Sequence, residues 1–280
     1  MEFREKLAHF RSTHAYSVLR VPGAEIRYYL AGEGSPLVFL NGGMNISEMW
    51  MDYLERLEKH HRVLIFDYPM GLTTNQLLIR GMDDMFRQLG IEKPVLIGAS
   101  DGGMVAQLYT QKYPQNVGGL ILCATGGMDQ RTLRSLKKQY FFTPALLWYM
   151  KRCNYEKFKK KLIKAGAGHA KSESPETQAR VREMFEAMFE GYPKEKDVHI
   201  TGLLADLMNQ VPVTAETFAH LKGKILLMLP EDDFFSPRMQ EDLKALMPGA
   251  KLVPVRGGHI STVLRPEEFL DTMEEFLQTL

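Results

Sequence analysis

One short pattern, Gly-x-Ser-x-Gly, constrains this chain more than any other feature; it runs from Gly98 to Gly102. The apolar residues 94–97 before it predict a buried strand. Residues 104–113 after it predict a helix, which must stop at Pro114 because proline cannot continue a helix. A serine between a strand and a helix is typical of a nucleophile elbow.

The predicted turn has physical consequences for Ser100. A turn this sharp strains the backbone of the serine and lifts its hydroxyl clear of the sheet. Gly98 and Gly102 lack the Cβ atoms that would collide where the strand and the helix pass closely. The first amides of the new helix point toward whatever binds Ser100, and they favour negative charge there. We therefore expect Ser100 to be a nucleophile.

Strand and helix patterns alternate on both sides of this turn. Continuous apolar runs such as residues 63–66 are expected of parallel strands that are covered on both faces. The alternation predicts an α/β fold with a mostly parallel central sheet and helices on both faces. The other predicted strands cover residues 18–21, 26–30, 37–40, 118–124, 225–229 and 252–255, and the other predicted core helices cover residues 47–59, 77–89 and 266–277.

The alternation breaks near Gly126, and residues 130–221 show helical patterns without a convincing strand. The clearest helix begins at residues 174–176, where Ser-Pro-Glu supplies an N-cap, a proline at the first helical position and an early acid. We therefore expect a core of residues 1–128 and 222–280, interrupted by an all-helical cap region, residues 129–221. Open α/β sheets bind ligands at the carboxyl ends of their strands, so the cap region is expected to lie there.

The first half of the cap region, residues 131–171, is rich in Lys and Arg. The ordinary interpretation is a solvated helix face, and the alternative is attraction of anionic substrates or of a membrane surface. An aromatic cluster lies inside this basic stretch. If the cap region covers the site, Phe141, Phe142 and Trp148 are expected to form an apolar wall that faces Ser100 and binds an acyl group.

Composition narrows the class of protein. The 280 residues include 35 Lys and Arg against 34 Asp and Glu, so no overall charge favours binding to nucleic acid. No apolar stretch is long enough to span a bilayer, and the N-terminal residues lack the apolar core of a signal peptide. Cys123 and Cys153 show no zinc-type spacing, and as reduced cysteines they indicate a cytoplasmic protein.

A serine nucleophile needs a base, and the base needs an orienting acid. His259 is the best candidate base because it follows two glycines on the loop after the last predicted strand. The acid is expected after the preceding strand, where Glu231, Asp232 and Asp233 follow one another. The order Ser, Asp, His along the chain is the one that the nucleophile elbow requires. Spacing alone does not choose among the three carboxylates, and Asp129 is the candidate if none of them serves.

These motifs resemble the α/β-hydrolase fold superfamily, specifically its lidded, single-domain serine hydrolases. The resemblance covers nearly the whole chain and rests on four motifs in order, namely residues 41–43 (Asn-Gly-Gly), GASDGG at the elbow, residues 231–233 (Glu-Asp-Asp) and residues 258–259 (Gly-His). In such proteins the acid loop usually reads Gly-x-x-Asp. That pattern implies Asp233 as the acid, with Asp232 as a neighbour, although Pro230 stands where glycine is usual.

The resemblance also implies an oxyanion hole, formed by the backbone amides of Gly43 and Asp101. Each such donor is worth roughly 3–4 kcal/mol in an acyl transfer. Asn41 replaces the histidine that usually supports this loop, and we expect its side chain to support the loop by hydrogen bonds. Relatives that act on haloalkanes or epoxides have Asp at the centre of the elbow, so Ser100 favours acyl transfer.

The side chain of Asp101 has two possible roles. The first is that of an acid at the start of a helix, which complements the helix dipole while it points away from the oxyanion. The second is attraction of a cationic group on the substrate, such as an amine.

We expect a cytoplasmic serine hydrolase that cleaves carboxylic esters or thioesters of small, partly apolar molecules through an acyl-enzyme. It should need no cofactor and no metal. Its partner should be a small acyl substrate, with no nucleic acid and no integral membrane segment. The alternatives are amide or C–C bond hydrolysis by the same machinery, or a ligand-binding receptor that turns over slowly.

Overall fold

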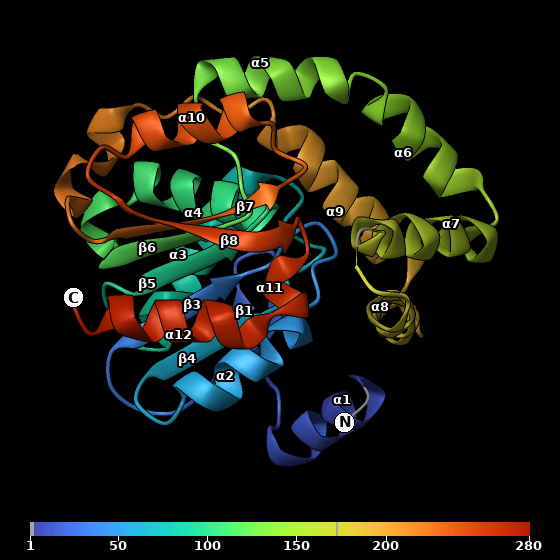
Figure 1. The fold of residues 1–280 in the computed structure, drawn as a ribbon, viewed down its shortest axis with the longest axis horizontal. Coiled ribbons are helices and arrows are strands. Elements are labelled where there is room, and N and C mark those ends of the chain that lie inside the picture. Colours follow the sequence, from blue (N-terminus) through green and yellow to red (C-terminus); the bar gives the residue numbers. More distant parts are fainter. Residues whose placement is uncertain (1–2, 172) are drawn as a thin grey trace.

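The structure, a computed structural model, describes residues 3–171 and 173–280. In this part of the chain eight strands form one sheet, in the order β1-β2-β4-β3-β5-β6-β7-β8, with helices on both faces (Figure 1). β1 pairs antiparallel with β2, and β2 with β4, whereas all other neighbours are parallel. The predicted fold class is therefore confirmed. The strands are β1 (Ser17–Val21), β2 (Ala24–Ala31), β3 (Pro36–Leu40), β4 (Arg62–Phe66), β5 (Val95–Ala99), β6 (Gly119–Cys123), β7 (Ile225–Asp232) and β8 (Lys251–Gly258).

The four predicted core helices begin and end close to their predicted positions, and the core also contains helices over residues 3–13, 237–246 and 261–264, which were not predicted. One of the four predicted helices starts at residue 75 because the Thr74 hydroxyl caps it, accepting a hydrogen bond from the Leu77 amide. The helix after the elbow starts at Asp101, three residues before its prediction, since the turn at Ser100 leads directly into it. These elements are α1 (Phe3–Thr13), η1 (Ser47–Trp50), α2 (Met51–Leu57), α3 (Asn75–Gln88), α4 (Asp101–Lys112), η2 (Pro114–Asn116), α10 (Pro237–Leu246), α11 (Ser261–Leu264) and α12 (Pro266–Leu277).

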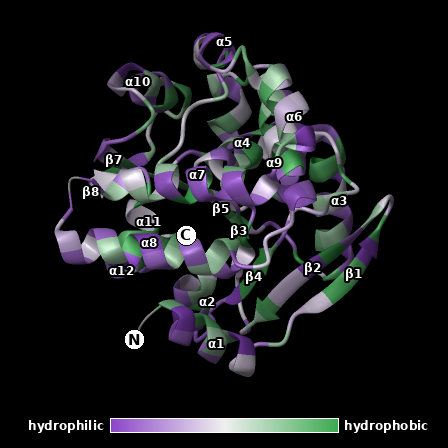
Figure 2. Ribbon diagram, turned by 90° about the vertical axis from the view of Figure 1, so that its right-hand side faces the viewer, coloured by the Kyte–Doolittle hydropathy of each residue, from purple (hydrophilic) through white to green (hydrophobic). Residues whose placement is uncertain are grey.

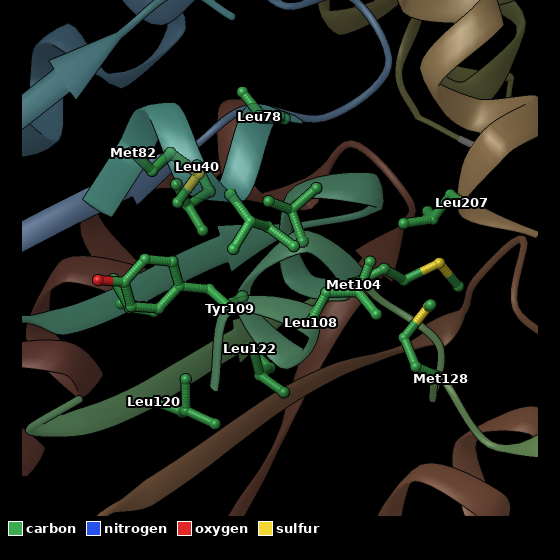
Figure 3. Packing of buried hydrophobic residues seen from close by; sticks show 14 of the residues in the cluster. Leu40, Leu78, Met82, Met104, Leu108, Tyr109, Leu120, Leu122, Met128 and Leu207 are labelled. Atoms are coloured by element: carbon green, nitrogen blue, oxygen red, sulfur yellow. The ribbon is translucent and has the colours of Figure 1, made fainter. Parts of the chain in front are cut away.

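The central strands bury both of their faces, which explains their continuous apolar runs. In β3, Val38 and Leu40 pack with α3 and α4 on one face, while Leu37 and Phe39 pack with α2 and α12 on the other. Figure 3 shows the first of these clusters around α4. Each fully buried side chain of this size contributes roughly 1.5–3 kcal/mol, so the sheet is a rigid platform for the loops at its ends.

Only helices are found in residues 129–171 and 173–221, between β6 and β7. The best-predicted of them, α8, begins at Pro175, and the Ser174 hydroxyl accepts a hydrogen bond from the Thr177 amide at 3.2 Å. Residues 1 and 2 of the predicted core and residue 172 of the predicted cap region lie outside the described residues. The helices are α5 (Gln130–Gln139), α6 (Thr143–Arg152), α7 (Tyr155–Ala167), η3 (Gly168–Ala170), α8 (Pro175–Phe189), α9 (Lys194–Leu207) and η4 (Ala215–Leu221).

The two ends of the cap region pack on the core, and its middle packs on itself and against α1, the loop after β3 and α11. Leu136 of α5 and Leu207 of α9 belong to the apolar cluster around α4, and Figure 3 shows Leu207 there. A separate cluster joins α7 and α8, including Phe185 and Phe189. In Figure 1 the region arches from α5, above the sheet, to α7 and α8 at its side.

The surface of α7 is hydrophilic where it faces solvent (Figure 2). The lysines at positions 157, 160, 161 and 164 are exposed there, as a solvated helix face would have them. No helix in the described residues is long and apolar enough to cross a membrane.

Candidate active site

Ser100 lies in the turn between β5 and α4, with backbone angles φ 53° and ψ −125°. A non-glycine residue at positive φ is strained, and such strain is held only where the surroundings fix it. A Cβ atom on Gly98 would come within 2.5 Å of the backbone of Gly102, and one on Gly102 would collide with the Leu40 carbonyl oxygen. The turn is fixed further by Thr125, whose hydroxyl donates to the Ser100 carbonyl oxygen at 2.6 Å.

A chain of hydrogen bonds joins Ser100 to two residues from distant loops. Ser100 Oγ lies 2.9 Å from His259 Nε2, and His259 Nδ1 lies 2.6 Å from Asp233 Oδ1. The side chain of Asp233 is 1% exposed. A carboxylate at Nδ1 favours the tautomer that carries its proton there, which leaves Nε2 free to accept the serine proton.

The structure distinguishes among the four candidate acids. Asp233 alone contacts the histidine, because a bulge in the β7–β8 pairing between Pro230 and Asp232 turns it inward. Glu231 and Asp232 are exposed. Asp129 instead caps α5, accepting hydrogen bonds from the amides of Arg131 and Thr132 at 2.8 and 3.0 Å.

Gly43, on the loop after β3, lies beside Asp101: a Cβ atom on Gly43 would come within 3.1 Å of Asp101 Oδ2. Neither backbone amide donates a hydrogen bond to any group in the described parts of the chain. Both line the cavity beside Ser100. Two free N–H groups next to a serine hydroxyl suit a developing oxyanion.

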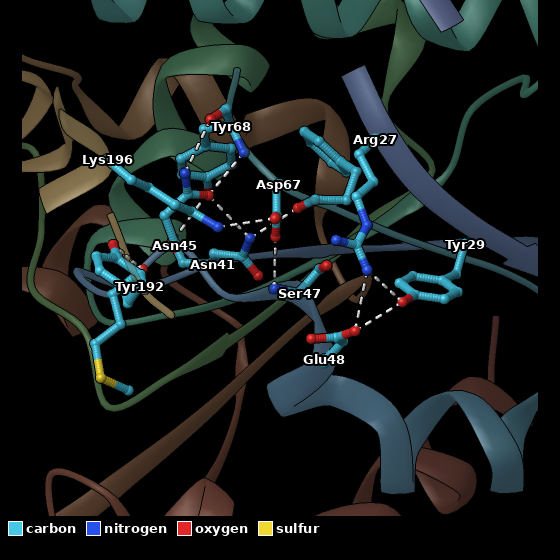
Figure 4. A network of polar contacts seen from close by, with 12 residues as sticks. Arg27, Tyr29, Asn41, Asn45, Ser47, Glu48, Asp67, Tyr68, Tyr192 and Lys196 are labelled. Atoms are coloured by element: carbon cyan, nitrogen blue, oxygen red, sulfur yellow. Dashed lines mark hydrogen bonds and ion pairs between the residues drawn. The ribbon is translucent and has the colours of Figure 1, made fainter. Parts of the chain in front are cut away.

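A buried polar network holds this loop (Figure 4). The side-chain amide of Asn41 donates to the Phe66 carbonyl oxygen at 2.7 Å, and its oxygen accepts from the Trp50 indole at 3.1 Å. Asn45 bonds both the amide and the carbonyl oxygen of Tyr68. The role in supporting this loop that we expected of Asn41 is therefore seen in its side-chain hydrogen bonds.

A cavity of about 400 Å³ opens in front of Ser100. The loops after β3, β5, β7 and β8 form one side of it, and α5, α7, α8 and α9 form the other. Its wall is mostly apolar, with a few polar groups near the serine, as in many small-molecule sites. Its apolar residues from the cap region include Leu136, Tyr140, Leu162, Phe185, Phe189, Leu204 and Met208.

The predicted acyl wall of Phe141, Phe142 and Trp148 is wrong. These side chains are 80%, 45% and 60% exposed, and none of them lines the cavity. The physical reason is the placement of α6, which packs against α9 and buries Met150. The aromatic side chains are thus left on the solvent side.

The side chain of Asp101 lies against Gly43, beside the expected oxyanion hole, whereas we had expected it to point away from the oxyanion. Its Oδ2 lies only 3.1 Å from the position that a Cβ atom on Gly43 would occupy. Burial raises the pKa of Asp101 to about 6, and the charge of nearby His259 offsets part of that rise.

Several residues of the site escaped the sequence analysis. Phe234 and Phe235 follow the acid directly, and their rings lie 5.7 and 5.8 Å from the ring of His259. Their position next to Asp233 in the sequence could have indicated that they belong to the site. His169 comes from the cap region, with its ring 5.9 Å from that of His259, and burial lowers its pKa. Asp197 of α9 also lines the cavity. No local pattern marks these last two.

Comparison with known proteins gives one family. Residues 37–272 match the model of a family described as "Alpha/beta hydrolase family". The chain is 29% identical over 117 residues to 2-hydroxy-6-oxo-6-phenylhexa-2,4-dienoate hydrolase of Comamonas testosteroni, a match that spans 37% of this chain and only 41% of that protein. It is 24% identical over 257 residues to pimeloyl-[acyl-carrier protein] methyl ester esterase of Aliivibrio fischeri, covering 88% of this chain and 95% of the esterase.

A similar solved structure is that of a thermophilic esterase from Thermogutta terrifontis. It superposes with a TM-score of 0.72 over 95% of this chain and 98% of its own, at 21% sequence identity. A likeness at this identity shows a shared fold and no more.

Proposed function

Because the chain belongs to the alpha/beta hydrolase family, we propose that it is a serine hydrolase of carboxylic esters or thioesters of small, partly apolar molecules. The observation that carries the proposal is the hydrogen-bond chain from Ser100 through His259 to Asp233, at distances of 2.9 and 2.6 Å. It opens on an apolar cavity beside two unbonded amides. This set of groups suits acyl transfer.

The reaction follows from this geometry. Ser100 Oγ attacks the substrate carbonyl carbon while His259 Nε2 takes its proton, and the amides of Gly43 and Asp101 hold the oxyanion. Asp233 keeps the imidazole in the required tautomer and stabilises its charge. Collapse of the tetrahedral intermediate breaks the bond to the leaving group, which receives the proton from His259. A water molecule, deprotonated by His259, then releases the acyl group from the serine.

We assign the cap region, residues 129–221, to substrate selection. Its helices face the carboxyl ends of the strands across the cavity, so a bound acyl group would lie between α7, α8 and the serine. Apolar walls reduce the contact of a bound substrate with water and strengthen the polar interactions at the reacting carbonyl.

The chemistry of the cavity favours this proposal over a hydrolase of anionic substrates. The name of the Comamonas relative specifies a dienoate, which carries a carboxylate. Among the described residues that line the cavity of this chain, none is Lys or Arg. A carboxylate there would lack a cationic partner, and burying an unpaired charge is costly.

Turnover of 4-nitrophenyl butyrate tests the proposal. We expect the wild-type protein to release nitrophenolate, and Ser100→Ala to lose this activity while keeping its fold. Ser135→Ala, which changes an exposed serine on α5, is the matched control and should behave as wild type. A wild-type protein that binds the ester without hydrolysing it would favour a receptor, and an active Ser100→Ala variant would exclude Ser100 as the nucleophile.

A further inference from the structure

The cavity holds more negative charge than acyl transfer requires. Two acidic residues, Asp101 and Asp197, line it, in addition to Asp233, whose carboxyl bonds His259. The described lining residues include no Lys and no Arg. A neutral ester would leave both carboxyls without a partner.

Asp197 is the more unusual of the two carboxyls. It lies in the first turn of α9, is only 8% exposed, and its Oδ2 has no hydrogen-bond partner among residues 3–171 and 173–280. The hydroxyl of Tyr155 faces this carboxylate and favours its charged form, and Tyr155 is not among the residues that line the cavity. A buried carboxylate is normally paired, and Asp197 has only neutral hydroxyls beside it and no ion pair among residues 3–171 and 173–280, so a cationic group in the cavity would complete its pairing.

The lysine next to Asp197 in the sequence does not pair with it. Lys196 is adjacent in sequence, but its Nζ lies 2.8 Å from the carboxylate of Asp67, on another part of the loop network (Figure 4). Tyr192 also neighbours Asp197, and its hydroxyl donates to the Met44 carbonyl oxygen at 2.7 Å. The charge of Asp197 is therefore available to whatever enters the cavity.

Asp101 adds a second negative charge to the cavity, close to Ser100. The groups that face it are His259, Tyr68 and Tyr140. Tyr68 already donates its hydroxyl hydrogen to the Asn41 carbonyl oxygen at 2.9 Å. An ionised Asp101 beside the oxyanion hole would oppose the negative charge of the transition state unless a positive charge lay near it.

We propose that Asp197 binds a cationic nitrogen of the substrate, so that the preferred substrates are esters or thioesters whose acyl part carries an amine. The inference rests on the proposed function, because it concerns the same cavity. An ammonium group has three donors and no acceptor, which suits an acceptor-only carboxylate. Asp101 supports the same preference through its negative charge. Substrates that carry a carboxylate are disfavoured by both residues.

Three 4-nitrophenyl esters of similar length test this, with 6-aminohexanoyl, heptanoyl and monoadipoyl groups as the cationic, neutral and anionic acyl parts. We expect kcat/KM to be highest for the cationic ester and lowest for the anionic one. The cationic-to-neutral ratio should be roughly tenfold or more, the scale of a hydrogen bond between charged groups. Asp197→Asn should bring this ratio close to one. Glu195→Gln, which removes an exposed charge two residues away on α9, should leave the ratio as in wild type.

The outcomes separate the two proposals. If the wild type hydrolyses none of the esters, the proposed function fails. If it hydrolyses the neutral ester but shows no preference for the cationic one, or if the preference survives in Asp197→Asn, the amine subsite fails and the serine hydrolase stands. If Asp197→Asn does not fold, the amine subsite is tested by measuring how well hexylammonium and hexanoate inhibit hydrolysis of the heptanoyl ester by the wild type. Hexylammonium should inhibit at lower concentration than hexanoate, and the reverse order would overturn the subsite.

Discussion

Replacement of Asp197 by asparagine should stabilise the free protein at neutral pH, although it removes a native side chain. Burial raises the pKa of Asp197 from 3.8 to about 6. The folded protein therefore holds this proton more tightly than the unfolded chain, and its stability falls as the pH rises from about 4 to about 6. Above pH 7 the full cost of the buried charge is present, and a neutral asparagine of the same shape avoids it.

The size of the effect follows from the pKa. A rise of about two units corresponds to about 3 kcal/mol of unfolding free energy. A chain of 280 residues has an unfolding entropy near 0.6 kcal/mol/K at its Tm, so the Tm should rise by about 5 °C at pH 8. At pH 4 the carboxyl is protonated in the folded protein, and most of the difference should disappear. The facing tyrosines, Tyr155 and Tyr192, have pKa values raised by burial and stay neutral throughout.

Thermal melts at pH 4 and pH 8 provide the assay, with Glu195→Gln as the control for a general change in net charge. The wild type and Glu195→Gln should have the same Tm at both pH values, since Glu195 is exposed. The reasoning would be refuted if Asp197→Asn had the same Tm as the wild type at pH 8. It would also be refuted if the increase in Tm were the same at pH 4 and pH 8. Either result would mean that Asp197 carries no unpaired charge in the folded protein.

Three further predictions concern the acid, the thiols and the apolar cavity. Asp233→Asn should lower kcat on the order of ten-thousandfold by favouring the wrong imidazole tautomer, as the same change does in serine proteases, whereas Asp232→Asn should cost far less; steady-state kinetics in the opposite order would contradict the assignment. A thiol reagent should modify Cys153 but not Cys123 in the native protein, because burial raises the pKa of Cys123 and shields its sulfur; two thiols reacting before unfolding would be inconsistent with this. For one leaving group, kcat/KM should rise about threefold to fourfold per added acyl carbon until the cavity is full, and a flat profile from acetyl to octanoyl would argue against an apolar acyl site.

The fold could be predicted because its signals are local. Apolar runs of four to six residues, separated by helical patterns, identify parallel strands without any knowledge of their partners. The elbow was equally accessible, because Gly98 and Gly102 meet backbone atoms that leave no room for a side chain. His259 could be identified as a candidate from its position after the last strand alone.

The identity of the acid needed more than spacing. Asp232 and Asp233 are adjacent, and a one-residue step reverses the face of a strand to which a side chain points. The bulge that turns Asp233 inward depends on the pairing of β7 with β8, which no local pattern records. Resemblance to a family pattern indicated Asp233, and the structure brings that residue to His259.

The lining of the cap region could not be predicted, because it depends on how helices pack. Trp148 and Met150 lie two residues apart on α6, yet one is 60% exposed and the other 1%. Either face of an aromatic-rich helix could turn inward until the position of α9 is known. The place of Asp197 in the cavity lining could not be predicted for the same reason, since a single acid in a helix usually points to solvent.

Covalent labelling by a fluorophosphonate, followed by intact-mass and peptide analysis, tests the central claim that Ser100 is the nucleophile. A nucleophile activated by His259 should add one label per chain, on the peptide that contains Ser100. Ser100→Ala should take up none while melting as a folded protein, and Ser135→Ala should be labelled as wild type. A label on another residue, or undiminished labelling of Ser100→Ala, would contradict the account.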